Sequence, residues 1–459
     1  MSACRYLTET AAGGAIPVTP LKAGELTAFL ERAPADAPWV RTLGFGAAPG
    51  SHCLLPAADG GLARVLLGIG DNPMWDWASL PAALPAATYR IDAPLSADEA
   101  EAAALGWALA TYRFDRYRKP SGVFAALAWP DAADRAAVER AADATFLVRD
   151  LITTPAADMG PAELAHAVAA VAQRFGARFT VIEGDELLVR GYPSVHAVGR
   201  ASDRAPRLID LLWGDEAAPK VTLCGKGVCF DSGGLDIKSA AGMKLMKKDM
   251  GGAAILLGLT QMIIDAGLPV RLRLLIPAVE NSISGNALRP LDVIRTRKGL
   301  SVEIGNTDAE GRVILADTLA EAASERPAVL IDCATLTGAA RVALGTELPA
   351  LFSNDDALAD GLLAAGRRVA DPLWRLPLWQ PYRRHVNGKT ADLTNAPDHA
   401  FAGAITAALF LAEFVEPACP WAHLDTMAWN LDNRPGRPEG GEAMGMRALF
   451  AALAARFAG

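Results

Sequence analysis

The sequence predicts an α/β fold in which helices cover both faces of a sheet. From about residue 160 onward, short apolar runs alternate with segments of helical periodicity. This alternation is typical of sheets that are covered by helices on both faces. The chain has 459 residues, of which 51% are hydrophobic and 21% charged. Such a chain can form two or three domains and bury a large core.

The first third of the chain contains few elements with a strong signal. A buried strand is expected at residues 63–69 and a shorter one at 124–129. Ser96 and Glu99 form a capping-box pattern, which predicts a helix over residues 96–112. The amphipathic stretch 131–152 predicts a long helix that links two domains. Pro155 ends it, because a residue before proline avoids helical geometry.

The rest of the chain predicts a regular series of elements. Strands are expected at residues 208–213, 221–224, 271–279, 329–333 and 422–424. Helices are expected at residues 161–175, 252–266, 313–324, 357–369, 402–414 and 443–457. Functional residues of such sheets gather in the loops beyond the strand ends.

Composition excludes several classes of protein. The net charge of −8 argues against a nucleic-acid-binding surface as the main function. The six cysteines form no CxxC pair, which indicates free thiols in a reducing compartment. We find neither a signal-peptide pattern nor an apolar run of about 18 residues, so we expect a cytoplasmic protein without a membrane span.

Residues 303–312, EIGNTDAEGR, concentrate charge between an expected strand and an expected helix. Asp308 and Glu310 lie two residues apart, and Arg312 follows. Crowded carboxylates repel each other unless a cation lies between them. The arginine beside them suggests that an anion is bound there too. Taken alone, the two acids equally fit a helix N-terminus, where the helix dipole favours them.

A second charged segment precedes the first and carries Lys226, Asp231, Lys238 and Asp249. The two segments together offer four carboxylates, a count that would neutralise two divalent cations such as Zn, Mn, Mg or Co. No histidine lies nearby, so we do not expect a histidine-based zinc site. A lysine between two glycines would alone suggest a phosphate binder, but the P-loop pattern is absent.

Together the two segments resemble the signature segments of the M17 leucyl aminopeptidase family, a group of two-metal exopeptidases. The resemblance is dense from about residue 149 onward and weak before it. It implies a smaller N-terminal α/β domain over residues 1–150, which ends in the linking helix. It also implies a larger catalytic domain over residues 151–459, in which helices sandwich a mixed sheet.

The resemblance implies roles for the residues that match the family motifs. The implied metal ligands are Lys226, Asp231, Asp249, Asp308 and Glu310. A lysine binds a metal only as the neutral amine, so its pKa must be strongly lowered in the metal-bound state. Lys238 matches the catalytic lysine of the family. Arg312 matches the arginine that holds a bicarbonate ion, which relays protons.

The family motifs also match residues that would contact the substrate. Met246 and Asn306 fall where relatives line the pocket for the N-terminal side chain, and Thr335 and Leu336 fall in a segment whose backbone binds substrate. We therefore expect a cytosolic metallo-aminopeptidase with two divalent ions per chain, Zn or Mn. Its substrates would be short peptides with an apolar first residue.

The resemblance further implies a homohexamer with enclosed active sites. Four aromatic residues were considered as surface that subunits would bury, namely Trp374, Trp379, Tyr382 and Trp421. Other functions stay open on the residues alone: a DNA-binding or regulatory protein on the same fold, a catalytically silent scaffold, and a two-metal phosphatase. The acidic charge weighs against the first, and the intact ligand set weighs against the second.

Overall fold

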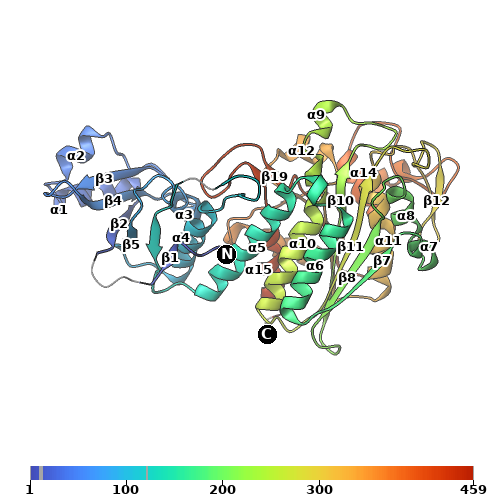
Figure 1. Ribbon diagram of the computed structural model, residues 1–459, viewed down its shortest axis with the longest axis horizontal. Coiled ribbons are helices and arrows are strands. Elements are labelled where there is room, and N and C mark those ends of the chain that lie inside the picture. Colours follow the sequence, from blue (N-terminus) through green and yellow to red (C-terminus); the bar gives the residue numbers. More distant parts are fainter. Residues whose placement is uncertain (1, 10–13, 120–121, 458–459) are drawn as a thin grey trace. The chain divides into compact units, whose positions relative to one another are not determined.

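The structure is a computed structural model that describes residues 2–9, 14–119 and 122–457. The chain forms two compact units: Met1–Phe146 with Asp432–Glu439, and Leu147–Leu431 with Gly440–Gly459. Helix α5 (Arg135–Thr153) contains the boundary between them (Figure 1). The domain limits expected from the sequence, 1–150 and 151–459, stay a prediction.

The first unit is built on a six-stranded sheet. Its strands are β1 (Leu7–Thr8), β2 (Ile16–Leu21), β3 (His52–Pro56), β4 (Leu62–Gly68), β5 (Thr88–Ile91) and β6 (Ala126–Ala128). Their order is β1-β6-β5-β2-β4-β3, and only β3 runs antiparallel to its neighbour. The sheet is therefore mixed.

Side chains of β4 alternate between two cores, one on each face of this sheet. Val65 and Leu67 pack into the cluster that contains Trp107, whereas Leu66 packs with Phe29. The helices that flank the sheet are α1 (Leu26–Arg32), α2 (Ala37–Thr42), α3 (Pro73–Trp77) and α4 (Ala97–Ala110). Both faces are thus covered, as strand alternation requires of a buried sheet.

The second unit contains a nine-stranded mixed sheet. Its strands are β7 (Arg178–Glu183), β8 (Arg207–Trp213), β9 (Lys220–Gly225), β10 (Gly227–Asp231), β11 (Arg271–Asn281), β14 (Val329–Ala334), β15 (Ala350–Ser353), β16 (Trp374–Arg375) and β18 (Trp421–Asp425). The order is β16-β15-β18-β14-β9-β11-β8-β7, with β10 beside β11. The central strands β18, β14, β9 and β11 are parallel, so their carboxyl ends lie at one edge.

Helices cover both faces of the large sheet (Figure 1). On one face lie α6 (Pro161–Phe175), α10 (Gly251–Asp265) and α15 (Met446–Phe457), with α13 (Asp356–Arg368) packed on α15. On the other lie α8 (Pro193–Gly199), α11 (Glu310–Ser324) and α14 (Gly403–Ala412). This arrangement confirms the predicted fold class.

Shorter elements complete the second unit. They are α7 (Glu186–Val189), α9 (Ala240–Met243), α12 (Gly338–Leu344), β12 (Val293–Arg295), β13 (Ser301–Glu303), β17 (Leu393–Thr394), β19 (Trp429–Asn430) and β20 (Gly440–Gly441). No helix among the described residues has the length and hydropathy needed to cross a membrane. All six cysteines are buried and unbonded.

Two expectations from the sequence need correction. The helix expected from residue 313 begins at Glu310, so Glu310 and Arg312 belong to its first turn. Trp421 was considered as surface between subunits, but its side chain is fully buried on β18. It donates a hydrogen bond to Asp332 (2.7 Å) inside the sheet's own core.

Candidate metal centre and active site

Lys226 lies at a break between two strands that run along the same neighbour. Strand β9 pairs with the first half of β11 and β10 with the second half. At the break, the Lys226 backbone N–H donates to the carbonyl of Cys333 (3.0 Å), and its carbonyl accepts from Ala253 (3.0 Å). These bonds hold Lys226 at the carboxyl edge of the sheet, where α10 begins.

The Lys226 ammonium lies in a buried ring of acceptors. Its Nζ is 2.7 Å from Asp249 Oδ2 and 2.8 Å from Glu310 Oε1, and it donates to the carbonyl of Thr335 (3.0 Å). Burial alone would lower the pKa of Lys226, but the carboxylates of Asp249 and Glu310 outweigh it and raise that pKa. The lysine is therefore a cation without a metal present.

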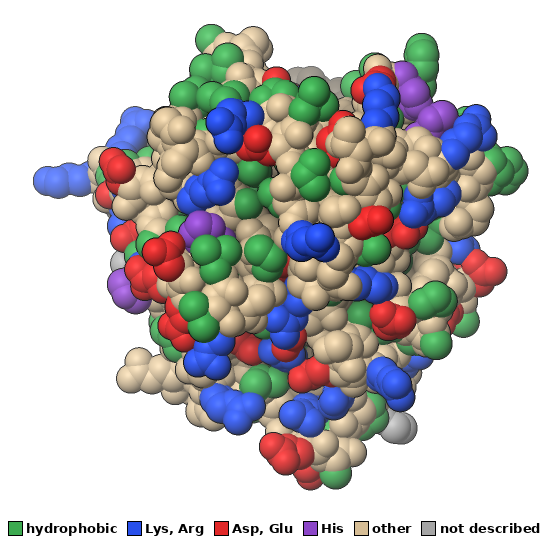
Figure 2. Space-filling model, turned by 90° about the vertical axis from the view of Figure 1, so that its right-hand side faces the viewer, with side chains coloured by type: hydrophobic (Ala, Val, Ile, Leu, Met, Phe, Trp, Pro, Cys, Tyr) green, Lys and Arg blue, Asp and Glu red, His purple; other side chains and the backbone are tan. Residues whose placement is uncertain are grey.

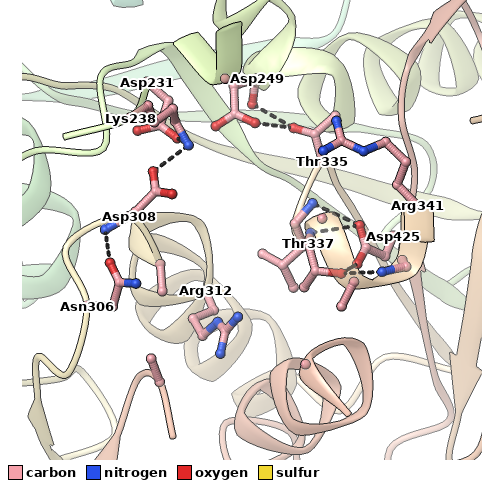
Figure 3. Close-up of a pocket in the computed structure, with 18 of the residues that line it drawn as sticks. Asp231, Lys238, Asp249, Asn306, Asp308, Arg312, Thr335, Thr337, Arg341 and Asp425 are labelled. Carbon is pink, nitrogen blue, oxygen red and sulfur yellow. Dashed lines mark hydrogen bonds and ion pairs between the residues drawn. The ribbon is translucent and has the colours of Figure 1, made fainter. Parts of the chain in front are cut away.

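Lys238 joins a second pair of carboxylates. Its Nζ is 2.7 Å from Asp231 Oδ2 and also forms an ion pair with Asp308 (Figure 3). Asp231 Oδ1 accepts hydrogen bonds from the Gly233 N–H and the Asn281 side chain, both at 2.9 Å. Gly233 has a φ of +88°, which an L side chain rarely adopts, so this turn depends on glycine.

Three of the predicted ligands converge closely. Asp231, Asp308 and Glu310 offer oxygen atoms that all lie within 4.8 Å of one another. Burial, together with the charge of Asp231, raises the pKa of Glu310 to about 8 and also raises the pKa of Asp308. Such raised pKa values show that this cluster lacks positive charge.

The donor set fits divalent cations. The four carboxylates form ion pairs with the two ammonium groups of Lys226 and Lys238. Glu310 Oε2 is buried and accepts no hydrogen bond from any described residue. An orphaned, buried carboxylate oxygen is costly unless a cation or donor reaches it. These residues have the charge and the oxygen ligands that Zn or Mn would use.

These side chains line a cavity of about 1040 Å³. The lining brings together ten of the residues predicted from sequence: Lys226, Asp231, Lys238, Met246, Asp249, Asn306, Asp308, Arg312, Thr335 and Leu336. Glu310 is not part of the lining and reaches the cluster through its ion pair with Lys226. The structure thus gathers every predicted site residue in or beside one cavity.

Arg312 points a free donor into the same region. Its Nη1 donates to the Asn395 carbonyl (2.6 Å), whereas its buried Nε has no hydrogen-bond partner within the described part of the chain. Burial lowers the pKa of Arg312 to about 10. Asn395 also donates to the Asn306 carbonyl (2.7 Å), and Asn306 Oδ1 accepts from the Asp308 N–H (2.8 Å).

Asp425 organises the segment after β14. Its Oδ1 accepts from the N–H groups of Leu336 (2.9 Å) and Thr337 (3.1 Å), and its Oδ2 accepts from the Thr337 hydroxyl (2.6 Å). The Thr335 hydroxyl donates to Asp249 Oδ1 (2.7 Å). The Leu336 N–H, which was expected near substrate, is thus already bonded to Asp425, and the Thr337 bonds to Asp425 fix the shape of this wall (Figure 3).

Sequence reasoning missed several residues of the site. Asn281 and Asp425 end β11 and β18, and a polar residue at the carboxyl end of a central strand was the signal that could have found them. Asn395 lies in a loop and offered no signal. Lys248 was not among the predicted site residues, yet it is buried in the cavity wall, and burial lowers its pKa to about 8.

Comparison with known proteins agrees with this geometry. Residues 146–450 match the catalytic domain of the cytosol aminopeptidase family, and residues 16–130 match the M17 aminopeptidase N-terminal domain. A probable cytosol aminopeptidase of Roseiflexus castenholzii is 43% identical over 367 residues, which are 76% of this chain and 75% of that protein.

Solved structures are similar over nearly the whole chain. The cytosol aminopeptidase of Coxiella burnetii shares 51% identity at a TM-score of 0.95, covering 98% of this chain and 99% of that one. The bottromycin maturation enzyme BotP in complex with Mn shares 37% identity at a TM-score of 0.87, covering 96% and 99%. By its sequence, its fold and the chemistry of its cavity, this chain belongs to the cytosol aminopeptidase family, M17, and is a metallo-aminopeptidase.

Proposed function

We propose that the chain uses two divalent ions to release N-terminal residues, preferably apolar ones, from short peptides. The observation that carries this proposal is the buried cluster in which Lys226 contacts Asp249 and Glu310 at 2.7 and 2.8 Å. A lysine surrounded in this way by acids, beside an open cavity, supports the proposal, because these residues together with Asp231 and Asp308 would supply the protein ligands of a dinuclear site.

The proposed ligands divide into two overlapping sets. Asp231, Asp308 and Glu310 would hold one ion, and the close approach of their oxygens supports this. Lys226 and Asp249 would hold the other, with Asp231 and Glu310 shared. The ions would polarise the scissile carbonyl and lower the pKa of water, which yields a nucleophile at neutral pH. To bind, they would have to displace the proton of Lys226 and the ion pairs of Lys238.

Lys238 and Arg312 are the proposed catalytic residues. Lys238, freed from Asp231 and Asp308, would donate to the oxygen on which negative charge develops. Arg312 would hold a bicarbonate ion through donors that include its unpartnered Nε. That ion would supply a proton acceptor for water and a proton donor for the leaving amine.

The preference for an apolar first residue rests on the cavity wall. Met246 and Met427 both line the cavity, and a flexible thioether packs well against mid-sized apolar groups. Asn306, Thr335 and Leu336 are the other proposed substrate contacts. A free α-amine would face the metals, so a blocked peptide should not be a substrate.

A substrate panel tests this proposal. Leucine anilide should be hydrolysed with Mn or Zn, whereas N-acetyl-leucine anilide and a phosphate ester should not. Efficient cleavage of the acetylated compound would remove the exopeptidase claim. Cleavage of the phosphate ester alone would favour the two-metal phosphatase.

The proposed assembly is a homohexamer whose active sites face an interior cavity. Trp374 and Trp379 support a buried interface, because 58% and 53% of their surfaces are exposed, and exposed aromatic residues are enriched where subunits meet. Light scattering at micromolar concentration should give a mass near six chains. A mass near one or two chains would contradict the assembly but not the chemistry.

A cytoplasmic location and the absence of nucleic-acid binding complete the proposal. Six buried, unbonded cysteines agree with a reducing compartment. On the face drawn in Figure 2, Lys and Arg side chains are interspersed with Asp and Glu and form no basic field. A gel shift with duplex DNA at low salt should show no binding; a salt-dependent shift would revive the regulatory alternative.

A further inference from the structure

Lys248 is a buried cation without a partner in the wall of the cavity. Only 5% of its surface is exposed, and the residue lines the cavity. Its ammonium forms no hydrogen bond or ion pair with any residue in the described ranges. Lys226 and Lys238, by contrast, each contact two carboxylates. Lys248 therefore stands apart from the lysines of the metal centre.

Neither nearby carboxylate satisfies Lys248. Asp249 and Asp425 both act on it through space, but Asp249 is ion-paired with Lys226, and the two oxygens of Asp425 already accept three hydrogen bonds from Leu336 and Thr337. A buried charge without a hydrogen-bonded partner is costly to a folded protein. The cost is recovered if a ligand brings an anion to this position.

Arg341 adds a second positive charge to the same cavity. Its guanidinium lines the cavity from α12 (Figure 3) and makes one weak contact, from Nη1 to Met427 Sδ at 4.0 Å. The charge of Arg341 is felt at Lys248. Neither Lys248 nor Arg341 is bonded to a carboxylate of a described residue, so this part of the cavity carries two positive charges that an anionic ligand can reach.

The chain order places this end beside the pocket for the first residue of the substrate. Lys248 lies two residues after Met246 and directly before Asp249, all in one short 3-10 turn, Met246–Met250. Met246 and Met427 supply apolar walls, and Lys248 and Arg341 supply charge. A side chain that is apolar along its length and anionic at its tip matches both features.

We propose that Lys248, supported by Arg341, receives the side-chain carboxylate of an N-terminal glutamate or aspartate. Acidic first residues then join apolar ones as substrates. This inference rests on the proposed aminopeptidase function and names a substrate class for it. The C-terminal carboxylate of a dipeptide has the same chemistry, so the test uses amino-acid anilides, which have no such group.

The test compares glutamate anilide with glutamine anilide, which has nearly the same shape without the charge. Leucine anilide is measured alongside, in the Mn-loaded enzyme. We expect kcat/KM for glutamate to exceed that for glutamine by about tenfold or more, the usual scale of a charge-assisted hydrogen bond. Lys248→Met should bring this ratio to about one or below. Arg341 lies on the exposed surface of α12, so Arg341→Met should lower the glutamate-to-glutamine ratio less than Lys248→Met does.

Lys244→Met is the matched control, because Lys244 is an exposed lysine of the same segment that does not line the cavity. It should keep the wild-type ratio. As a second readout, free L-glutamate should inhibit leucine anilide hydrolysis about tenfold more strongly than L-glutamine in the wild type. That comparison needs no variant and holds if Lys248→Met fails to fold.

The outcomes separate the two proposals. If leucine anilide is hydrolysed but kcat/KM for glutamine anilide equals that for glutamate anilide, the proposed site for acidic side chains is wrong and the aminopeptidase proposal stands. An unchanged ratio in Lys248→Met also overturns the site. A third outcome is that kcat/KM is higher for a dipeptide than for its C-terminal amide, whereas glutamate anilide and glutamine anilide have equal kcat/KM. Lys248 would then receive the C-terminal carboxylate, which contradicts this inference. If no anilide is hydrolysed, both proposals fall.

Discussion

Gly311 lies directly against the side chain of Lys226. A β-carbon at position 311 would come within 2.5 Å of Lys226 Cε and 2.7 Å of Nζ. No carbon atom fits at that distance, so the first turn of α11 needs glycine for the lysine to reach its carboxylates. The glycine between Glu310 and Arg312 is therefore a structural requirement of the candidate metal centre.

Gly311→Ala should displace Lys226 and weaken the site that it helps to form. We expect less bound metal and a kcat/KM lower by about 100-fold, the usual effect of a misplacement of about 1 Å. Elemental analysis and leucine anilide hydrolysis measure both quantities. The control is Gly361→Ala in helix α13, where a β-carbon meets nothing within 4 Å. A fully active Gly311→Ala would refute the packing argument.

Lys238→Ala and Arg312→Ala should lower kcat far more than they change the metal content. Loss of one donor to the developing oxyanion costs about 10²–10³ in rate, and the Arg312→Ala variant would lack the guanidinium that we propose holds bicarbonate. Turnover and metal content are measured on the same samples. Near-normal turnover in either variant would show that its assigned role is wrong.

The raised pKa of Asp317 should make the free energy of unfolding depend on pH, and this residue is not among the candidate metal ligands. Burial raises its pKa from 3.8 to about 6, although Oδ1 and Oδ2 accept from the N–H groups of Arg297 (2.7 Å) and Ser194 (2.8 Å). The folded state then binds more protons than the unfolded state between these pH values. Stability should fall by about 3 kcal/mol as pH rises from about 4 to above 6.

The comparison with Asp317→Asn isolates this effect, because both proteins share every other titrating group. The difference in unfolding free energy between the wild type and the variant should shift in favour of the variant as pH rises through this window. Urea denaturation at several pH values measures it. A difference that stays constant with pH would contradict the raised pKa.

Arg149 and Glu442 form a buried ion pair in the second unit. The atoms Nη2 and Oε2 are 2.9 Å apart, and the Arg149 side chain is fully buried. Arg149→Ala should cost about 3–5 kcal/mol, since it leaves a buried carboxylate unpaired. The exposed pair of Arg190 and Glu186 is the control, and Arg190→Ala should cost less than about 0.5 kcal/mol. Equal effects in a thermal melt would argue against this reading.

The sequence predicted the central elements well because their periodicity is strong. The helix expected at 161–175 is α6 with the same bounds, and the strand expected at 271–279 is most of β11. Edge elements were missed where burial is partial. β7, for example, has only exposed and half-buried residues, so its apolar pattern is weak.

The candidate site was also predicted only in part from the sequence. A lysine between two glycines, taken alone, is more often a phosphate binder than a metal ligand, and only the family resemblance assigned Lys226 to the metal. Contacts between distant segments could not be predicted: Asn281 bonds to Asp231 across 50 residues and Asn395 to Arg312 across 83. These partners are brought together by the strand order of the sheet, which periodicity does not encode.

The central claim is that these residues hold two divalent ions that the reaction needs. The most direct measurement is a titration of metal-free protein with Mn²⁺, in which bound metal and leucine anilide hydrolysis are followed in the same samples. We predict no hydrolysis without metal and full activity when two ions are bound per chain. Asp308→Asn and Glu310→Gln should lose both metal and rate. Full turnover by the metal-free protein would contradict the account.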